Sequence, residues 1–125
     1  MTKSAATYLA EANASVPRIK GAEAIAHHST GAIFIDVRDS ADIAKSGTIA
    51  GAKRIPRGMI EFRADPAMEQ FYDADLKKDS QLYLVCGAGG QAALAGKTLR
   101  DMGYTNVTNI GGIGEWKEAG GPMED

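Results

Sequence analysis

Residues 81–92 read QLYLVCGAGGQA: a short apolar run, a cysteine, three glycines within four positions and the start of a helical pattern. The apolar run is rich in aliphatic and aromatic residues, which is typical of a buried strand. Residues 92–102 carry apolar side chains at helical spacing and are followed by Gly103, a usual helix stop. A strand, a glycine-rich turn and a helix therefore follow one another, and Cys86 stands where the strand ends.

The same alternation of strands and helices continues along the rest of the chain, without an internal repeat or a low-complexity segment. This order predicts an open α/β fold with a mainly parallel sheet. The predicted strands are residues 32–37, 53–55, 81–85 and 106–110, and the predicted helices are residues 3–13, 22–28, 41–45, 58–63, 67–72, 92–102 and 113–119.

The composition is that of an ordinary globular domain. Of the 125 residues, 44% are hydrophobic and 24% are charged, which predicts one domain with its own core. The formal net charge of −2 gives no support for nucleic-acid binding. A single cysteine excludes an internal disulfide, and together with His27 and His28 it matches no familiar zinc spacing. Because no signal peptide or membrane span is recognisable, we expect a soluble cytoplasmic protein without a metal or cofactor.

The position of Cys86 suggests a reactive thiol. In open α/β sheets, ligands bind beyond the carboxyl ends of the strands. Consecutive glycines allow several backbone N–H groups to point inward, and the helix that follows adds the positive end of its dipole. Such surroundings favour the thiolate over the thiol, and the thiolate is the reactive form.

Other interpretations compete for this segment. A lone cysteine is often an inert buried residue, but successive glycines are costly unless the backbone has to curl around something. Residues 87–92 also fit the nucleotide-binding pattern G-x-G-x-x-A, which requires an acidic residue near the end of the next strand, and residues 106–110 contain none. A cysteine phosphatase loop, C-x5-R, requires an arginine where this chain has Ala92. The sequence therefore favours a reactive Cys86 outside both classes.

Four blocks in order resemble the single-domain rhodanese (thiosulfate sulfurtransferase) family, over roughly residues 19–122. Any one block alone is weak, whereas four in register are specific. The blocks are FIDVRD at 34–39, GTIAGA at 47–52 with IPRG at 55–58, the six-residue loop at 86–91, and GGIGEW at 111–116 with AGGP at 119–122. The resemblance predicts a domain over residues 18–125 and a helical extension over residues 1–17 that packs on it.

The resemblance implies an α/β sheet of about five mainly parallel strands with helices on both faces. It also implies a sulfurtransferase that takes sulfane sulfur from a donor such as thiosulfate, holds it as a persulfide on Cys86, and passes it to cyanide or a thiol. The partners would be small sulfur compounds and, as a further acceptor, a protein. The cradle for the sulfur would be built from Gly87, Ala88, Gly89, Gly90 and Gln91.

Several residues have two interpretations. Arg57 belongs, with Lys53 and Arg54, to a basic cluster that either contacts an anionic donor or partner or is solvated surface. The pair Asp36 and Arg38 is either catalytic or, as we interpret it, a structural charge pair at a strand end.

Two positions depart from the family pattern, and two other functions stay open for the same fold. Thr48 replaces a common histidine, and Gln91 stands where bacterial members often have arginine. The loop then carries no charged side chain. The alternatives are a non-catalytic interaction module and a redox sensor at Cys86, which would form mixed disulfides because no second cysteine is present.

Overall fold

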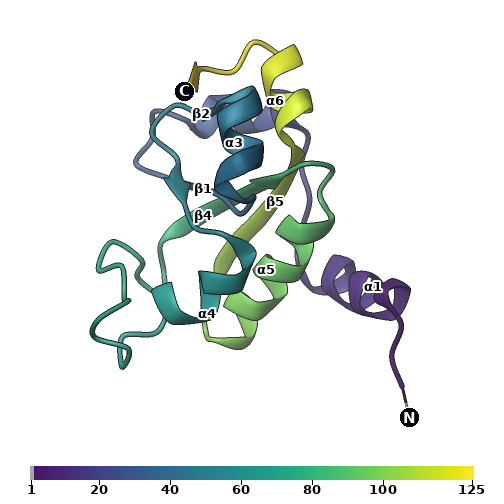
Figure 1. Ribbon diagram of the computed structural model, residues 1–125, viewed down its shortest axis with the longest axis vertical. Coiled ribbons are helices and arrows are strands. Elements are labelled where there is room, and N and C mark those ends of the chain that lie inside the picture. The colour runs from purple at the N-terminus through teal and green to yellow at the C-terminus, as the bar shows by residue number, and fades with distance from the viewer. Residues whose placement is uncertain (1) are drawn as a thin grey trace.

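A four-stranded parallel sheet forms the centre of the molecule in the computed structural model, which describes residues 2–125 (Figure 1). Its strand order is β3-β1-β4-β5. The bounds are β1 (Ile33–Asp36), β3 (Lys53–Arg54), β4 (Gln81–Cys86) and β5 (Asn106–Gly112). At the outer edge of β5, Arg18 adds an isolated parallel bridge to Asn109. The α/β class and the parallel sheet predicted from the sequence are confirmed.

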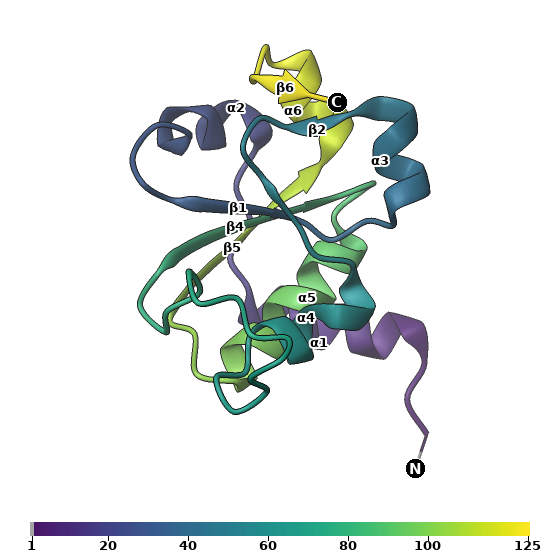
Figure 2. The same ribbon diagram turned by 60° about the vertical axis from the view of Figure 1, so that its left-hand side comes forward.

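Helices cover both faces of this sheet (Figure 2). The side with α1, α4 and α5 lies opposite the side with α2 and α6, and α3 follows β1 at the end of the sheet. The bounds are α1 (Ala5–Ser15), α2 (Gly21–Ala24), α3 (Ser40–Ser46), α4 (Ile60–Arg63), α5 (Gly90–Asp101) and α6 (Ile113–Glu118), with 3-10 turns at Ile25–His27 and Arg57–Met59. A small antiparallel pair, β2 (Thr48–Ile49) and β6 (Met123–Glu124), lies apart from the main sheet.

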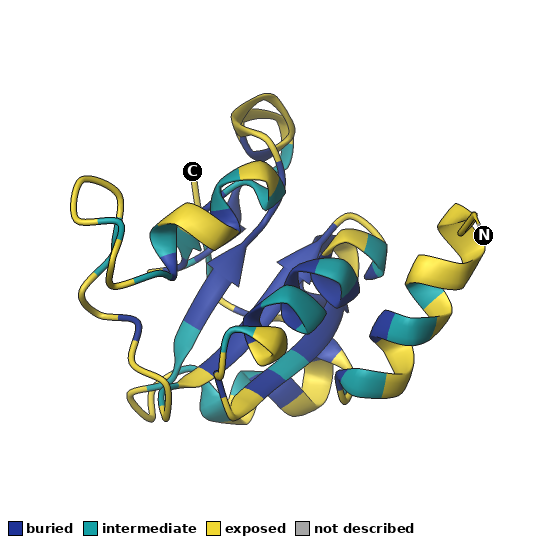
Figure 3. Cartoon of the chain, turned by 90° about the horizontal axis from the view of Figure 1, so that it is seen from below, coloured by how far each residue is buried: buried dark blue, intermediate teal, exposed yellow. Residues whose placement is uncertain are grey.

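The central strands are buried on both faces, which explains why their sequences are continuous apolar runs (Figure 3). Because side chains alternate along a strand, Leu82 and Leu84 pack into one core, and Tyr83 and Val85 pack into the other. The first core lies beneath α1, α4 and α5, and the second includes Trp116 of α6. Two layers of helices around one sheet therefore fix the position of the strand that ends at Cys86.

Helix α1 begins at a serine cap and ends before a proline. The Ser4 hydroxyl accepts a hydrogen bond from the backbone N–H of Thr7 at 3.2 Å. Most of α1 is exposed, but Ala12 is buried and Val16, just after the helix, enters the first core. The division between residues 1–17 and 18–125 stays a prediction.

The helix predicted over residues 67–72 is wrong. This segment forms turns instead. The Asp65 carboxylate accepts the N–H of Ala67 at 2.9 Å, and the N–H groups of Phe71 and Tyr72 both bond to the carbonyl of Met68. The Asp65 contact is one that a helix N-terminus could also make, but residues 67–72 bury no side chain completely, and a helix in a protein depends mainly on packing of an apolar face. Among the described residues, no helix is both long and apolar enough to cross a membrane.

Candidate active site

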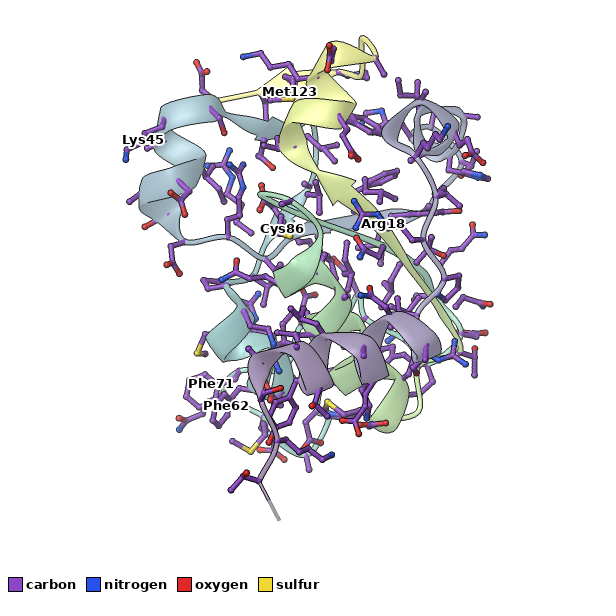
Figure 4. All side chains as sticks on the ribbon, turned by 90° about the vertical axis from the view of Figure 1, so that its right-hand side faces the viewer. Arg18, Lys45, Phe62, Phe71, Cys86 and Met123 are labelled. Atoms are coloured by element: carbon purple, nitrogen blue, oxygen red, sulfur yellow. The ribbon has the colours of Figure 1, made fainter. Side chains whose placement is uncertain are left out.

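Cys86 is the last residue of β4, a central strand with β1 on one side and β5 on the other. The residue is 1% exposed. Its Sγ accepts hydrogen bonds from the backbone N–H groups of Gly89 at 3.0 Å and Ala92 at 3.3 Å. These two donors lie at and just inside the N-terminus of α5, so the positive end of that helix also faces the sulfur. One N–H of the predicted loop and one of the first turn of α5 therefore meet at the sulfur of Cys86, which Figure 4 labels.

Glycine is required at two places for this geometry. Gly89, the residue that caps α5, has a φ of +104°, in the region that side-chain-bearing residues rarely adopt. Gly112 on β5 pairs with Cys86, and a Cβ built on it would collide with the carbonyl oxygen of Gly87. One glycine lets the loop turn its N–H toward the sulfur, and the other lets β5 approach the loop closely.

Asn109 on β5 secures the loop from behind. Its side chain is buried, donates to the carbonyl of Gly89 at 2.9 Å and accepts the N–H of Gly111 at 2.8 Å. Sequence reasoning missed this residue. A usable signal was present, because an asparagine inside a predicted buried strand needs hydrogen-bond partners.

Arg18 also contacts the loop and was missed. Its Nη2 donates to the carbonyl of Ala88 at 3.3 Å and lies 3.8 Å from a carboxylate oxygen of Glu115 on α6. Arg18 and Ala88 are 70 positions apart in the chain, and no local pattern marks the contact.

The remaining predicted residues are Gly90 and Gln91, where the loop enters α5, and Arg57, in the 3-10 turn before α4. Gly90, Gln91 and Arg57 line one groove of about 490 Å³, together with residues of α1 and α5: Ala5, Tyr8, Leu9 and Leu94. The Arg57 guanidinium donates to Glu61 at 3.1 Å and to the Thr98 hydroxyl at 3.0 Å. The structure thus brings Arg57 beside Gln91, with part of its hydrogen-bonding capacity already used.

The rest of the basic cluster is engaged elsewhere. Lys53 binds Asp73 and Asp75, each at 2.8 Å, and Arg54 pairs with Glu124 at 3.3 Å. Partial burial by itself lowers the pKa of Lys53, but the hydrogen bonds with Asp73 and Asp75 outweigh it, and the pKa lies above 10.5. These carboxylates neutralise the two cations.

Asp36 and Arg38 form a buried ion pair with Nη2 to Oδ2 at 2.8 Å, and Thr48 donates to the same oxygen at 2.7 Å. This geometry agrees with the structural interpretation of the pair. Thr48, one of the two departures from the family pattern, therefore has a defined place in a hydrogen-bond network. Within residues 2–125 no group of three or more His, Cys, Asp or Glu side chains is placed to hold a metal ion.

Comparison with known proteins finds related sequences and structures. Residues 20–119 match the family model described as a rhodanese-like domain. The adenylyltransferase and sulfurtransferase UBA4 of Candida albicans is 43% identical over 58 residues, which are 46% of this chain and 13% of that protein. The chain therefore spans a small part of the length of this relative.

Two solved structures are similar over most of the chain. A Rhodopseudomonas palustris protein of unknown function, described as a possible tyrosine phosphatase, is 38% identical with a TM-score of 0.90 and covers 99% of this chain and 96% of its own. The human single-domain sulfurtransferase TSTD1 is 31% identical with a TM-score of 0.69, over 82% of this chain and 96% of its own.

Proposed function

The chain belongs to the rhodanese-like domain family, and from this premise we propose that it is a sulfurtransferase that carries sulfane sulfur as a persulfide on Cys86. One observation carries the proposal: the backbone N–H groups of Gly89, in the glycine-rich loop, and of Ala92, in the first turn of α5, converge on Sγ of the only cysteine in the chain. Backbone donors aimed at sulfur favour a negative charge there, which both a thiolate and a persulfide anion carry.

In the first step, the Cys86 thiolate attacks the outer sulfur of a donor such as thiosulfate. A bond forms between Sγ and that sulfur, the sulfur–sulfur bond of thiosulfate breaks, and sulfite leaves with the bonding electron pair. The negative charge then rests on the outer sulfur of the persulfide. The loop from Gly87 to Gln91 is the group of backbone donors that would hold this charge, in the manner of an oxyanion hole.

In the second step, an acceptor attacks the outer sulfur. Cyanide forms a carbon–sulfur bond, the persulfide bond breaks, and thiocyanate leaves while the Cys86 thiolate is restored. A thiol, small or on a protein, would take the same sulfur as its own persulfide. The groove at Gly90, Gln91 and Arg57 adjoins the loop, and we assign to it the approach of donor or acceptor.

Phosphatase chemistry has weaker support, although one similar structure is described as a possible tyrosine phosphatase. A C-x5-R loop clamps phosphate through its arginine, and the corresponding residue here is Ala92, whose N–H bonds to Sγ. A non-catalytic module has no need of the cysteine, and a redox sensor, which would also use a thiolate, has no second cysteine in this chain to resolve the oxidised one.

The experiment is a steady-state assay of thiocyanate formation from thiosulfate and cyanide. Cys86→Ser should lower the rate by at least about 10³-fold because it removes the nucleophile. Its thermal unfolding curve should match that of the wild type, which separates loss of chemistry from loss of fold. A Cys86→Ser protein that forms thiocyanate at the wild-type rate would refute the proposal.

A further inference from the structure

A single peptide group connects Arg18 to the sulfur of Cys86. The carbonyl oxygen of Ala88 accepts a hydrogen bond from Arg18 Nη2 at 3.3 Å, and the N–H of Gly89 donates to Cys86 Sγ at 3.0 Å. These two atoms belong to the same peptide bond, and the described residues contain no cis peptide. In a trans peptide the C=O and N–H point in opposite directions. The guanidinium and the sulfur therefore lie at opposite ends of one peptide dipole.

The backbone on either side holds Arg18 at this place. Asn109 donates its N–H to the carbonyl of Pro17 at 2.8 Å, and its carbonyl accepts the N–H of Ile19 at 3.0 Å. This bridge fixes the segment against the edge of the sheet. Figure 4 labels both Arg18 and Cys86.

The guanidinium rests directly on the loop. A Cβ built on Gly89 would collide with the Arg18 guanidinium, and one built on Gly111 would meet first the Glu115 carboxylate and then Arg18 Nη2 at 2.9 Å. The arginine head group therefore fills the side-chain position of Gly89, and the Arg18–Glu115 pair fills that of Gly111. The two glycines leave the space that this contact needs.

The charge of Arg18 is only partly neutralised. Glu115 is its ion-pair partner at 3.8 Å, and the two side chains are 45% and 55% exposed. An exposed pair at this distance is weak. A cation bound to a carbonyl oxygen polarises the peptide and strengthens the donor at its other end. The Gly89 N–H is that donor.

We infer that Arg18 is a positioning residue that strengthens the Gly89 N–H toward a negatively charged sulfur on Cys86. It supplies, from outside the loop and through one peptide group, a positive charge that the side chains of residues 86–91 lack. The part that concerns the persulfide rests on the proposed function. The part that concerns the thiolate does not.

The test is the rate of alkylation of Cys86 by two reagents at one pH on the rising limb of the wild-type pH–rate profile, where the rate follows the fraction of thiolate. Both form a carbon–sulfur bond and release iodide, but iodoacetamide is neutral and iodoacetate is an anion. Because the chain has one cysteine, the whole signal reports on Cys86. The variants are Arg18→Gln and Arg18→Lys. Arg100→Gln, at an exposed position near the end of α5, is the control for net charge.

Arg18→Gln should slow the reaction with iodoacetamide by about three- to tenfold, since it removes a charge-assisted hydrogen bond that is partly exposed. Arg18→Lys should recover at least about half of the loss on a logarithmic scale because it keeps the charge. Arg100→Gln should stay within about twofold of the wild type. An unchanged iodoacetamide rate in Arg18→Gln, or a loss confined to iodoacetate, would overturn the inference, since the second result indicates long-range steering of anions alone.

A second readout separates polarisation from simple loosening of the loop. In the amide proton spectrum, Arg18→Gln should move the Gly89 resonance upfield and leave that of Ala92 nearly in place, because Ala92 bonds to the same sulfur through a different peptide. Equal movement of both resonances would contradict the inference. A wild-type protein that alkylates as expected but takes no sulfur from thiosulfate would refute the proposed function and leave the assignment of Arg18 standing.

Discussion

Two neighbouring strands of the sheet end side by side in opposite ways. β1 and β4 are parallel, with Asp36 in register with Val85, so Asp36 and Cys86 come to the same edge. Beyond β1, side chains surround the carboxylate of Asp36. Beyond β4, backbone N–H groups and a more distant cation surround the sulfur of Cys86. The charged groups at the end of β1 therefore bond to one another, whereas the donors at the end of β4 can stabilise a negative charge on sulfur.

At the end of β1, the charges satisfy one another. The carboxylate of Asp36 accepts hydrogen bonds from the backbone N–H, Nε and Nη2 of Arg38 and from the Thr48 hydroxyl. The remaining Arg38 donors reach Ser46 and the carbonyl of Gly47. The Asp36 side chain is 0% exposed and that of Arg38 is 7% exposed. A network with this burial and pairing fixes structure and leaves little capacity for a ligand.

At the end of β4, the donors come from the backbone and have fixed directions. In the proposed function, their partner is a sulfur atom that passes between a thiolate and a persulfide. Backbone dipoles stabilise each anionic form without a counter-charge that must move, which is the condition for catalysis by preorganised dipoles. The glycines that build the loop cost backbone entropy, and the two cores beneath it hold its shape.

The largest effect on stability should follow from removing one partner of the buried ion pair between Asp36 and Arg38. Arg38→Met leaves the Asp36 carboxylate buried without its partner and should lower the free energy of unfolding by about 3–5 kcal/mol. Urea unfolding measures this. Arg54→Met is the matched control because it removes an exposed ion pair with Glu124 and should cost less than about 1 kcal/mol. Equal losses in the two variants would show that burial does not set the strength of the Asp36 pair.

A methyl group in the loop should have the next largest effect. In Gly89→Ala the Cβ needs a strained φ and displaces the Arg18 head group, so we expect a loss of about 1–3 kcal/mol in the free energy of unfolding. Gly87→Ala, where a Cβ would meet nothing within 4 Å, should cost less than about 0.5 kcal/mol. If both substitutions are tolerated equally, the loop does not have the described shape.

Adding a charge to the loop should have a moderate effect. Gln91→Arg places a guanidinium beside the groove shared with Arg57, and it should lower the KM for thiosulfate by about three- to tenfold at low salt and less at high salt. Gln70→Arg adds the same charge in the turn over residues 67–72 and should leave KM unchanged. A KM insensitive to Gln91→Arg at low salt would mean that position 91 does not face the donor.

The smallest effect concerns the ion pair of Lys53 with Asp73, which is less buried than the pair of Asp36 with Arg38. Partial burial raises the pKa of Asp73, but the hydrogen bonds from Lys53 and the backbone of Asp75 outweigh it, so the pKa lies below 3.8. A carboxylate with a lowered pKa stabilises the fold above its unfolded pKa and loses that contribution as the pH falls through its folded pKa.

Asp73→Asn should therefore cost about 1 kcal/mol of unfolding free energy at pH 7, and this difference should disappear under acid. Urea unfolding at pH 7 and at a pH below the folded pKa of Asp73 measures this difference. Asp75→Asn, at a position with a 72% exposed side chain, should cost less than half as much. A penalty for Asp73→Asn that is the same under acid as at pH 7 would contradict this account.

The sequence predicts the elements that depend on local patterns. The buried strands at Ile33–Asp36 and Gln81–Cys86 are continuous apolar runs, and the glycines after Cys86 predict the loop. The helix over residues 67–72 fails because none of these residues is buried, so no packed apolar face holds a helix there. Arg18 and Asn109 could not be assigned to the loop, because their contacts join segments 70 and 20 positions apart.

The central claim is that Cys86 is the residue that carries the transferred sulfur atom. The most direct test is the intact mass of the protein after incubation with thiosulfate, followed by cyanide. We predict a gain of one sulfur atom that cyanide removes, with neither change in Cys86→Ser. A wild-type protein that gains no sulfur, or a Cys86→Ser protein that gains and loses one as the wild type does, would contradict the account.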